Sequence, residues 1–290
     1  MQLSILAPLL YLLLGLALGR APFEIKSRAS ALLTKAVIPL VIIYNIATHR
    51  PGVFAIMTGM MAMMIALLLL SRTQSRDPVQ NLCFSYLNIG WLGMPVASTL
   101  YGDGAAMVFI AAYVGSSLLG NSVGVGLMAQ GRDLKTRAWE TLKAPPVWAL
   151  LAGLACIPLG PELEARARPI YEALKFLMSL LGMSILGIWL SATRLRLSDL
   201  GAALRLSALR AVAVGALLTL FIALSRQLDI RLVLENQQAL YLMCLLPPAA
   251  NIIVLETHYM KSGRSASLIA CGTCISIAAI GVYVALTQLS

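Results

Sequence analysis

Apolar stretches long enough to cross a lipid bilayer recur along this chain, and they constrain its fold more than any other feature. A membrane-spanning helix needs roughly 20 consecutive apolar residues. Mean hydropathy is +0.85 and only 12% of the residues are charged, against about 25% in an average globular domain. We therefore expect an all-α polytopic membrane protein with ten transmembrane helices. The ten predicted segments are residues 3–19, 30–46, 53–70, 82–100, 105–128, 146–160, 169–191, 206–225, 237–256 and 266–288.

Basic residues are distributed unevenly between the connections. Most of the 22 Lys and Arg residues fall in the first, third, fifth, seventh and ninth connections. Because cytoplasmic loops are enriched in Lys and Arg, we expect the odd connections to be cytoplasmic and both termini to be extracytoplasmic. This pattern predicts a multi-pass protein of the cell inner (plasma) membrane. It also accounts for the net charge of +10 without a nucleic-acid partner.

The chain divides into two halves of five predicted segments each. "PLLYLLLGLA" (8–17) and "PVWALLAGLA" (146–155) share a Pro followed by Gly-Leu-Ala at the same spacing. An odd number of spans per half places two related halves in opposite orientations. We therefore predict a first inverted repeat over residues 1–128, a cytoplasmic linker over 129–145 and a second inverted repeat over 146–290.

The fourth and ninth predicted segments are both interrupted near their centres. Proline removes a backbone donor and clashes with the preceding helical turn, and non-helical backbone survives at membrane depth only when protein or a watery cavity surrounds it. Interrupted helices in corresponding positions of two inverted repeats are typical of transporters, where they meet at the binding site. We therefore predict that helices 4 and 9 meet at a binding site. The interrupting residues are Asn88, Gly90, Gly93 and Pro95 in the fourth segment and Pro247, Pro248 and Asn251 in the ninth.

The chemistry of the two interruptions favours an anionic solute. A helix that restarts after a break presents free N–H groups and the positive end of its dipole. Asn88 and Asn251 add neutral amide groups that can donate or accept hydrogen bonds, and neither interruption contains Asp or Glu. We therefore expect a small organic anion as substrate and neither a metal site nor a cofactor. The alternative is that these prolines only kink helices, since Pro and Gly are common in membrane spans.

Four stretches of the sequence resemble the auxin efflux carrier family, which includes a bacterial permease branch and the plant PIN carriers. "NIGWLGMP" (88–95), with "YG" (101–102) after it, is similar to the fourth-span motif of that family. "LPPAANIIVL" (246–255) resembles the ninth-span segment of bacterial members, and "GSSLLGNSVGVGLMAQG" (115–131) resembles the fifth span. The resemblance extends over essentially the whole chain.

This resemblance implies a fold and a function. It implies two inverted five-helix repeats with crossed helices 4 and 9, a scaffold domain from spans 1, 2, 6 and 7, and a moving transport domain from spans 3–5 and 8–10. It also implies carboxylate substrates, either auxin-like or dicarboxylic acids, and a homodimer formed through the scaffold. The residues that match the crossover motifs of the family are Asn88, Pro95, Pro247, Pro248 and Asn251.

Four polar residues outside the interruptions are further candidates for substrate contact. Ser116 and Asn121 lie in the fifth segment, where small residues four apart also suit close helix packing. Tyr44 and Asn45 lie near the outer half of the second segment, where aromatic and polar side chains are also common at the membrane interface. For each pair, packing or interfacial placement is the alternative to substrate binding.

Glu256 and His258 depart from the small residues that the family often has at the end of the ninth span. Ionisable groups inside a membrane are functional candidates by default, and His titrates near neutrality. We therefore name both residues as candidates for proton coupling. The alternative is that both are solvated at the cytoplasmic interface.

These features together predict a secondary transporter of small organic anions that works by elevator-type alternating access. The alternative is a sodium- or proton-coupled symporter or antiporter of the bile-acid symporter-like or cation antiporter type. A channel remains open because an interrupted helix can also line a pore. We do not expect an enzyme, since "YGDG" (101–104) supplies one carboxylate where aspartyl chemistry needs two, and the motifs of zinc proteases and serine hydrolases are absent.

Overall fold

The chain folds into helices throughout the part that the structure, a computed structural model, describes. One isolated β-bridge stands outside the helices, and no strand forms among the described residues. Most of the predicted cytoplasmic linker over 129–145 lies outside the described residues. The described residues are 2–19, 28–29, 31–48, 52–128, 133, 135–136, 139, 143, 145–192, 197–256, 260, 262 and 264–289.

The helical elements follow the predicted apolar segments closely. Two of them, η1 and η2, are short π-helices, and η3 and η4 are 3₁₀-helices. The elements are α1 (Gln2–Leu18), η1 (Leu33–Val37), α3 (Ile38–Ala47), α4 (Val53–Gln74), α5 (Pro78–Ser85), η2 (Ile89–Gly93), α6 (Met94–Met128), α8 (Pro145–Ala155), η3 (Ile157–Leu159), α9 (Gly160–Ala192), α10 (Leu197–Gln227), α11 (Arg231–Glu235), α12 (Gln237–Tyr241), η4 (Leu242–Leu245), α13 (Asn251–Leu255) and α14 (Ser265–Leu289).

Several of these helices can cross a bilayer. By length and hydropathy four described helices qualify, and a fifth span results if the pair Val147–Ala155 and Ile157–Ile185, bent by 58°, is counted as one. The prediction of an all-α fold is confirmed for the described residues, and these helices are compatible with a multi-pass membrane protein. The same test does not reach ten spans. Helix α1 is 17 residues long, α3 is 10 residues long, and the predicted segment 237–256 is divided into short pieces. The test also counts Ile89–Gly120 as one helix, where the sequence predicts two spans. The four qualifying helices are Val53–Gln74, Ile89–Gly120, Asp199–Gln227 and Ser265–Leu286.

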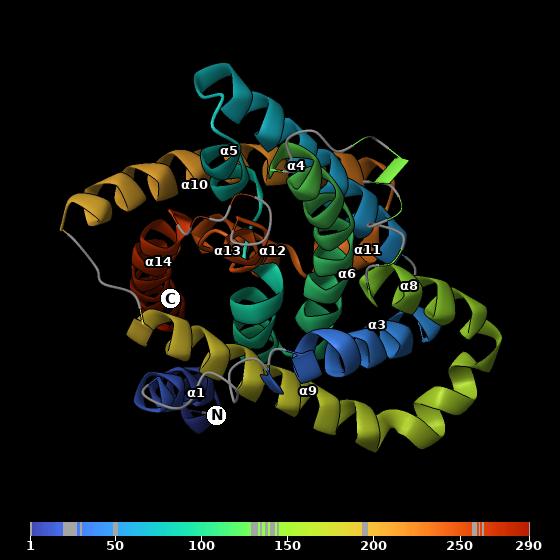
Figure 1. Cartoon of the computed structure of the whole chain (residues 1–290). Coiled ribbons are helices and arrows are strands. Elements are labelled where there is room, and N and C mark those ends of the chain that lie inside the picture. The colour runs from blue at the N-terminus through green and yellow to red at the C-terminus, as the bar shows by residue number, and fades with distance from the viewer. Residues whose placement is uncertain are drawn as a thin grey trace.

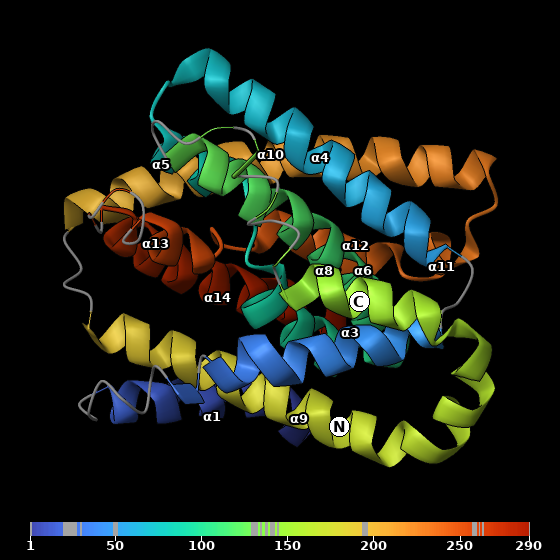
Figure 2. The same ribbon diagram turned by 45° about the vertical axis from the view of Figure 1, so that its right-hand side comes forward.

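Helices α1, α3, α8 and α9 form one packed group along one side of the molecule (Figures 1 and 2). The closest approach is between α1 and α9. A Cβ atom built on Gly15 would lie 2.0 Å from the carbonyl oxygen of Ser184, and one on Gly187 would lie 2.2 Å from that of Leu12. Only glycine permits such backbone contact, which is a common way for membrane helices to pack.

The remaining helices form a second group on the other side of the molecule, with α4 and α10 at its outer edge (Figure 2). The short pieces η2, η4 and α13 lie in its interior. Within α6, Gly102 has a φ of 77° and divides the element into two helices, at the boundary predicted between segments 82–100 and 105–128. The division of the molecule into a scaffold and a transport domain stays a prediction.

Candidate functional site

The two interrupted segments contact each other directly through their backbones. The N–H of Asn88 donates to the carbonyl of Pro247 over 2.9 Å, and the N–H of Ala249 donates to the carbonyl of Tyr86 over 2.9 Å. Because a proline ring has no N–H, the "Pro-Pro" pair cannot continue the helical ladder of its own segment. Each break therefore uses the other break to satisfy part of its backbone.

The fourth predicted segment continues as a helix immediately after this contact. The N–H of Gly93 donates to the carbonyl of Asn88 over 3.0 Å, which closes the π-turn of η2. Glycines allow the tight packing here: a Cβ on Gly90 would lie 2.6 Å from the ring of Tyr113, and one on Gly93 would lie 2.8 Å from the side chain of Leu246. The glycines of the predicted interruption thus have a steric role.

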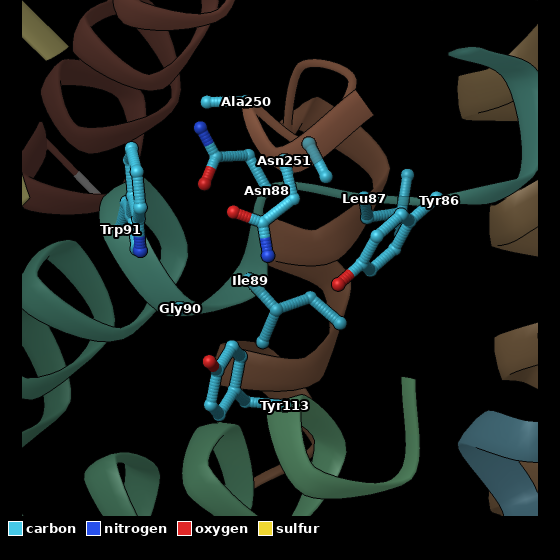
Figure 3. A pocket seen from close by; sticks show the side chains of 10 residues that line it. Tyr86, Leu87, Asn88, Ile89, Gly90, Trp91, Tyr113, Ala250 and Asn251 are labelled. Carbon is cyan, nitrogen blue, oxygen red and sulfur yellow. The ribbon is translucent and has the colours of Figure 1, made fainter. Parts of the chain in front are cut away.

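A small cavity lies where the two segments meet (Figure 3). Its volume is about 10 Å³, which is room for a single water molecule. A carboxylate can therefore enter only after the lining elements separate. The lining residues, none of which is acidic, are Tyr86, Leu87, Asn88, Ile89, Gly90, Trp91, Tyr113, Ala249, Ala250 and Asn251.

Asn88 is the most unusual residue of this cavity. Its side chain is 4% exposed, and its Nδ2 atom has no hydrogen-bond partner among the described residues. Buried polar groups nearly always find partners, and leaving one unpaired costs roughly 1–3 kcal/mol. Asn251, from the other segment, places its amide at the same cavity (Figure 3). The cavity therefore offers a neutral hydrogen-bond donor that the protein does not use.

The other residues predicted in the interruptions, together with Ser116, do not line this cavity. Pro247 and Pro248 take part in the backbone contact between the segments. Pro95 lies in α6, where its carbonyl accepts hydrogen bonds from two hydroxyls of the next turn. Ser116 donates to a carbonyl of its own helix over 3.1 Å. The side chain of Asn121 lies outside the described residues.

Tyr44 and Asn45 lie at a different place, between α3 and α9. The ring of Tyr44 stacks on that of Tyr171 with 4.1 Å between centroids. The Asn45 amide donates to the carbonyl of Val41 over 2.8 Å and accepts from the Tyr171 hydroxyl over 3.2 Å. These contacts place both side chains within the packed group, and any part in substrate binding stays a prediction.

Glu256 caps the N-terminus of α14. Its side chain is fully buried, and its carboxylate accepts hydrogen bonds from the Ser262 hydroxyl (2.6 Å) and from the N–H groups of Arg264 (2.6 Å) and Ser265 (2.9 Å). Backbone N–H groups can only donate, so these contacts stabilise the ionised carboxylate. The geometry favours a capping role for Glu256 over proton carriage. His258, the second coupling candidate, lies outside the described residues.

Tyr86 and Tyr113 both line the cavity, but neither is among the residues that the sequence predicts for this site. Tyr86 comes directly after α5, two residues before Asn88, so its position beside the break was a usable signal. Tyr113 lies some twenty residues after the break and reaches it only through the packing of α6 against η2. Nothing local in the sequence indicates that contact.

No known protein-family model matches the chain, and no curated protein sequence matches it.

Proposed function

We propose that this protein is a secondary transporter of small organic anions, with the anion held where the two interrupted segments meet. The observation that carries the proposal is the buried, unpartnered amide of Asn88 beside a cavity without acidic residues. A carboxylate oxygen can accept a hydrogen bond from that amide, and the positive end of the helix that begins with η2 favours an anion. Carboxylates, either auxin-like or dicarboxylic acids, are the substrates that fit this chemistry.

The proposed fold is that of the auxin efflux carrier family, with ten spans in two inverted repeats. In this arrangement α5, η2 and the first part of α6 make the fourth span, and α12, η4 and α13 make the ninth. The packed group of α1, α3, α8 and α9 is the scaffold and the dimer contact, and the second group is the transport domain. The contact between the two breaks supports this arrangement.

The small volume of the cavity supports alternating access over an open pore. A cavity of about 10 Å³ is closed to a carboxylate, so the solute must enter and leave through a change in structure. We propose that this change is an elevator-type movement of the transport domain. Because the lining has no acidic residue, we propose the anion carrier in preference to a sodium- or proton-coupled exchanger.

The decisive experiment is uptake of labelled carboxylates into proteoliposomes that contain purified variants. We expect Asn88→Ala and Asn251→Ala to lose transport while remaining folded and monodisperse in detergent. The matched control is Asn236→Ala, whose amide hydrogen-bonds a carbonyl near α11, away from the cavity, and which we expect to retain transport. Unchanged transport in both cavity variants would show that the substrate binds elsewhere.

Sodium or pH gradients imposed on the same vesicles test the alternative. A carrier of the proposed type transports the carboxylate without an imposed sodium or pH gradient. Strict dependence on a sodium gradient would favour the sodium-coupled exchanger instead.

A further inference from the structure

Arg210 is a buried cation beside the two interrupted segments. It lies in α10, its side chain is 1% exposed, and no carboxylate pairs with it in the described part of the chain. Its Nε atom finds no acceptor among the same residues. Charged side chains within membrane segments are costly and mark functional places. Arg210 therefore needs an explanation that surface charge or lipid contact does not provide.

The guanidinium of Arg210 holds the ends of two different helical pieces. Its Nη1 donates to the carbonyl of Cys83 over 3.0 Å, and its Nη2 donates to the carbonyl of Leu246. Cys83 lies in the last turn of α5, and Leu246 follows η4 directly. Both carbonyls therefore lie at the end of the last helical piece before an interruption. One planar group with forked donors can serve two carbonyls from two segments, which a Lys ammonium does less well.

The two contacts place the positive charge where negative charge collects. The last carbonyls of a helix have no partner inside it, and each helix C-terminus carries about half a negative elementary charge. Two such ends together offset about one positive charge. The neighbouring carbonyl of Leu245 is also occupied, by the hydroxyl of Ser276. Arg210 therefore neutralises the carbonyl side of the crossing.

The amide side of the crossing has no such neutralisation. The helix formed by η2 and the first part of α6 starts at the cavity, and the Nδ2 atom of Asn88 is unpartnered there. With the carbonyl ends offset by Arg210, the N–H end of this helix and the free amide dominate the field in the cavity. If Arg210 were absent, the carbonyl ends would present partial negative charge and would attract cations, as unwound carbonyls do in other transporters.

We propose that Arg210 neutralises the carbonyl ends of both interrupted segments, and that it thereby makes the cavity selective for anions. This inference rests on the proposed function, since it names the charge class of the substrate held at the same cavity. Arg210 acts as a positioning and selectivity residue that does not itself line the cavity.

Chemical rescue tests the neutralising role without any knowledge of the substrate. Arg210→Ala removes the guanidinium and leaves both carbonyl ends exposed, so we expect a lower Tm that added methylguanidinium raises in a saturable way. The matched control is Arg205→Ala, an exposed arginine of the same helix, whose Tm we expect to be unaffected by methylguanidinium. An Arg210→Ala variant with unchanged Tm, or one that methylguanidinium does not stabilise, would overturn the neutralising role.

A series of one carbon skeleton with different charge tests the selectivity. Succinate, monomethyl succinate and dimethyl succinate carry two, one and no negative charges, and their binding can be measured by ligand-induced thermal shift. We expect the wild-type protein to bind monomethyl succinate about tenfold more tightly than dimethyl succinate, the equivalent of one charge-assisted hydrogen bond. We expect succinate, which is also an anion, to bind more tightly than dimethyl succinate as well.

Two substitutions separate charge from size in this series. Arg210→Lys keeps the charge and should keep the preference for the monoanion, whereas Arg210→Gln keeps polar donors without charge and should lose it. A purely structural role would lower the Tm of both variants and leave the preference unchanged, which would overturn the selectivity role. If the wild-type protein binds none of the three compounds, the proposed function fails for this class and the methylguanidinium result alone decides the role of Arg210.

Discussion

Asn88 and Asn45 are both buried asparagines, but their side-chain amides differ in hydrogen bonding. The amide of Asn45 makes two hydrogen bonds, to Val41 and to Tyr171. The Nδ2 atom of Asn88 makes none among the described residues. An unsatisfied buried donor costs stability in the empty protein, and binding sites commonly carry such a cost. This contrast distinguishes an amide with a structural role, that of Asn45, from one for which we propose a role in substrate binding, that of Asn88.

This contrast leads to a prediction about stability. Asn88→Ala removes an unpaired buried donor, so we expect its Tm in detergent to be equal to or above that of the wild-type protein, even though transport is lost. Asn45→Ala breaks two hydrogen bonds and should destabilise the protein by about 1–3 kcal/mol. Thermal unfolding of both variants measures the difference. A marked loss of stability in Asn88→Ala would indicate that its amide has a structural partner.

At the scale of single elements, the helices extend beyond their apolar segments where polar sequence can still form helix. Helix α9 runs from Gly160 to Ala192 and includes Pro169, although the apolar pattern predicts a span only from residue 169. Its first turns contain Glu and Arg residues at helical spacings, which support a solvated helix. Hydropathy predicts only the apolar part of such a helix and does not predict its polar extension.

The start of α14 gives a prediction at the same scale. Glu256→Gln keeps the size of the side chain but turns an amide N–H₂ toward backbone N–H groups, so we expect a loss of about 1–2 kcal/mol, as for other lost helix caps. Thermal unfolding measures this loss, and the pH dependence of transport should remain unchanged. Normal stability together with a lost pH dependence would instead identify Glu256 as a proton carrier.

At the scale of the whole molecule, an ion pair joins the two packed groups. Lys175 of α9 contacts Asp103 of α6 over 2.6 Å. An elevator-type movement of one group past the other would separate these two residues. By contrast, the hydroxyls of Tyr101 in α6 and Tyr283 in α14 lie 3.1 Å apart within one group, and their distance would not change.

Cross-linking tests this movement. We expect a short bifunctional thiol reagent to stop transport when it links Lys175→Cys to Asp103→Cys, because the two groups can then no longer move apart. The same reagent should leave transport intact when it links Tyr101→Cys to Tyr283→Cys. Wild-type protein treated with the reagent controls for the five native cysteines. Full transport in the first cross-linked variant would contradict the proposed movement.

The sequence alone predicts a helical, multi-pass membrane protein and the places where two of its segments break. Apolar segment length and proline chemistry are local properties, so they can be worked out without knowing the neighbours. Within the predicted interruptions at 88–95 and 247–251, the structure has non-helical or π-helical backbone at residues 88–93 and 247–250.

Only the tertiary structure decided which groups satisfy the broken backbone. The N–H of Asn88, the guanidinium of Arg210 and the Oδ1 atom of Asn45 find partners 36 to 159 residues away in the chain. The Nδ2 atom of Asn88 has no partner among the described residues. A hydrogen bond depends on position and direction within a few tenths of an ångström, and packing of distant helices sets both. The local sequence pattern therefore predicts where the two segments break. Packing of distant helices brings the two breaks into contact and buries Arg210 against both of them. It also leaves the Nδ2 atom of Asn88 without a partner among the described residues.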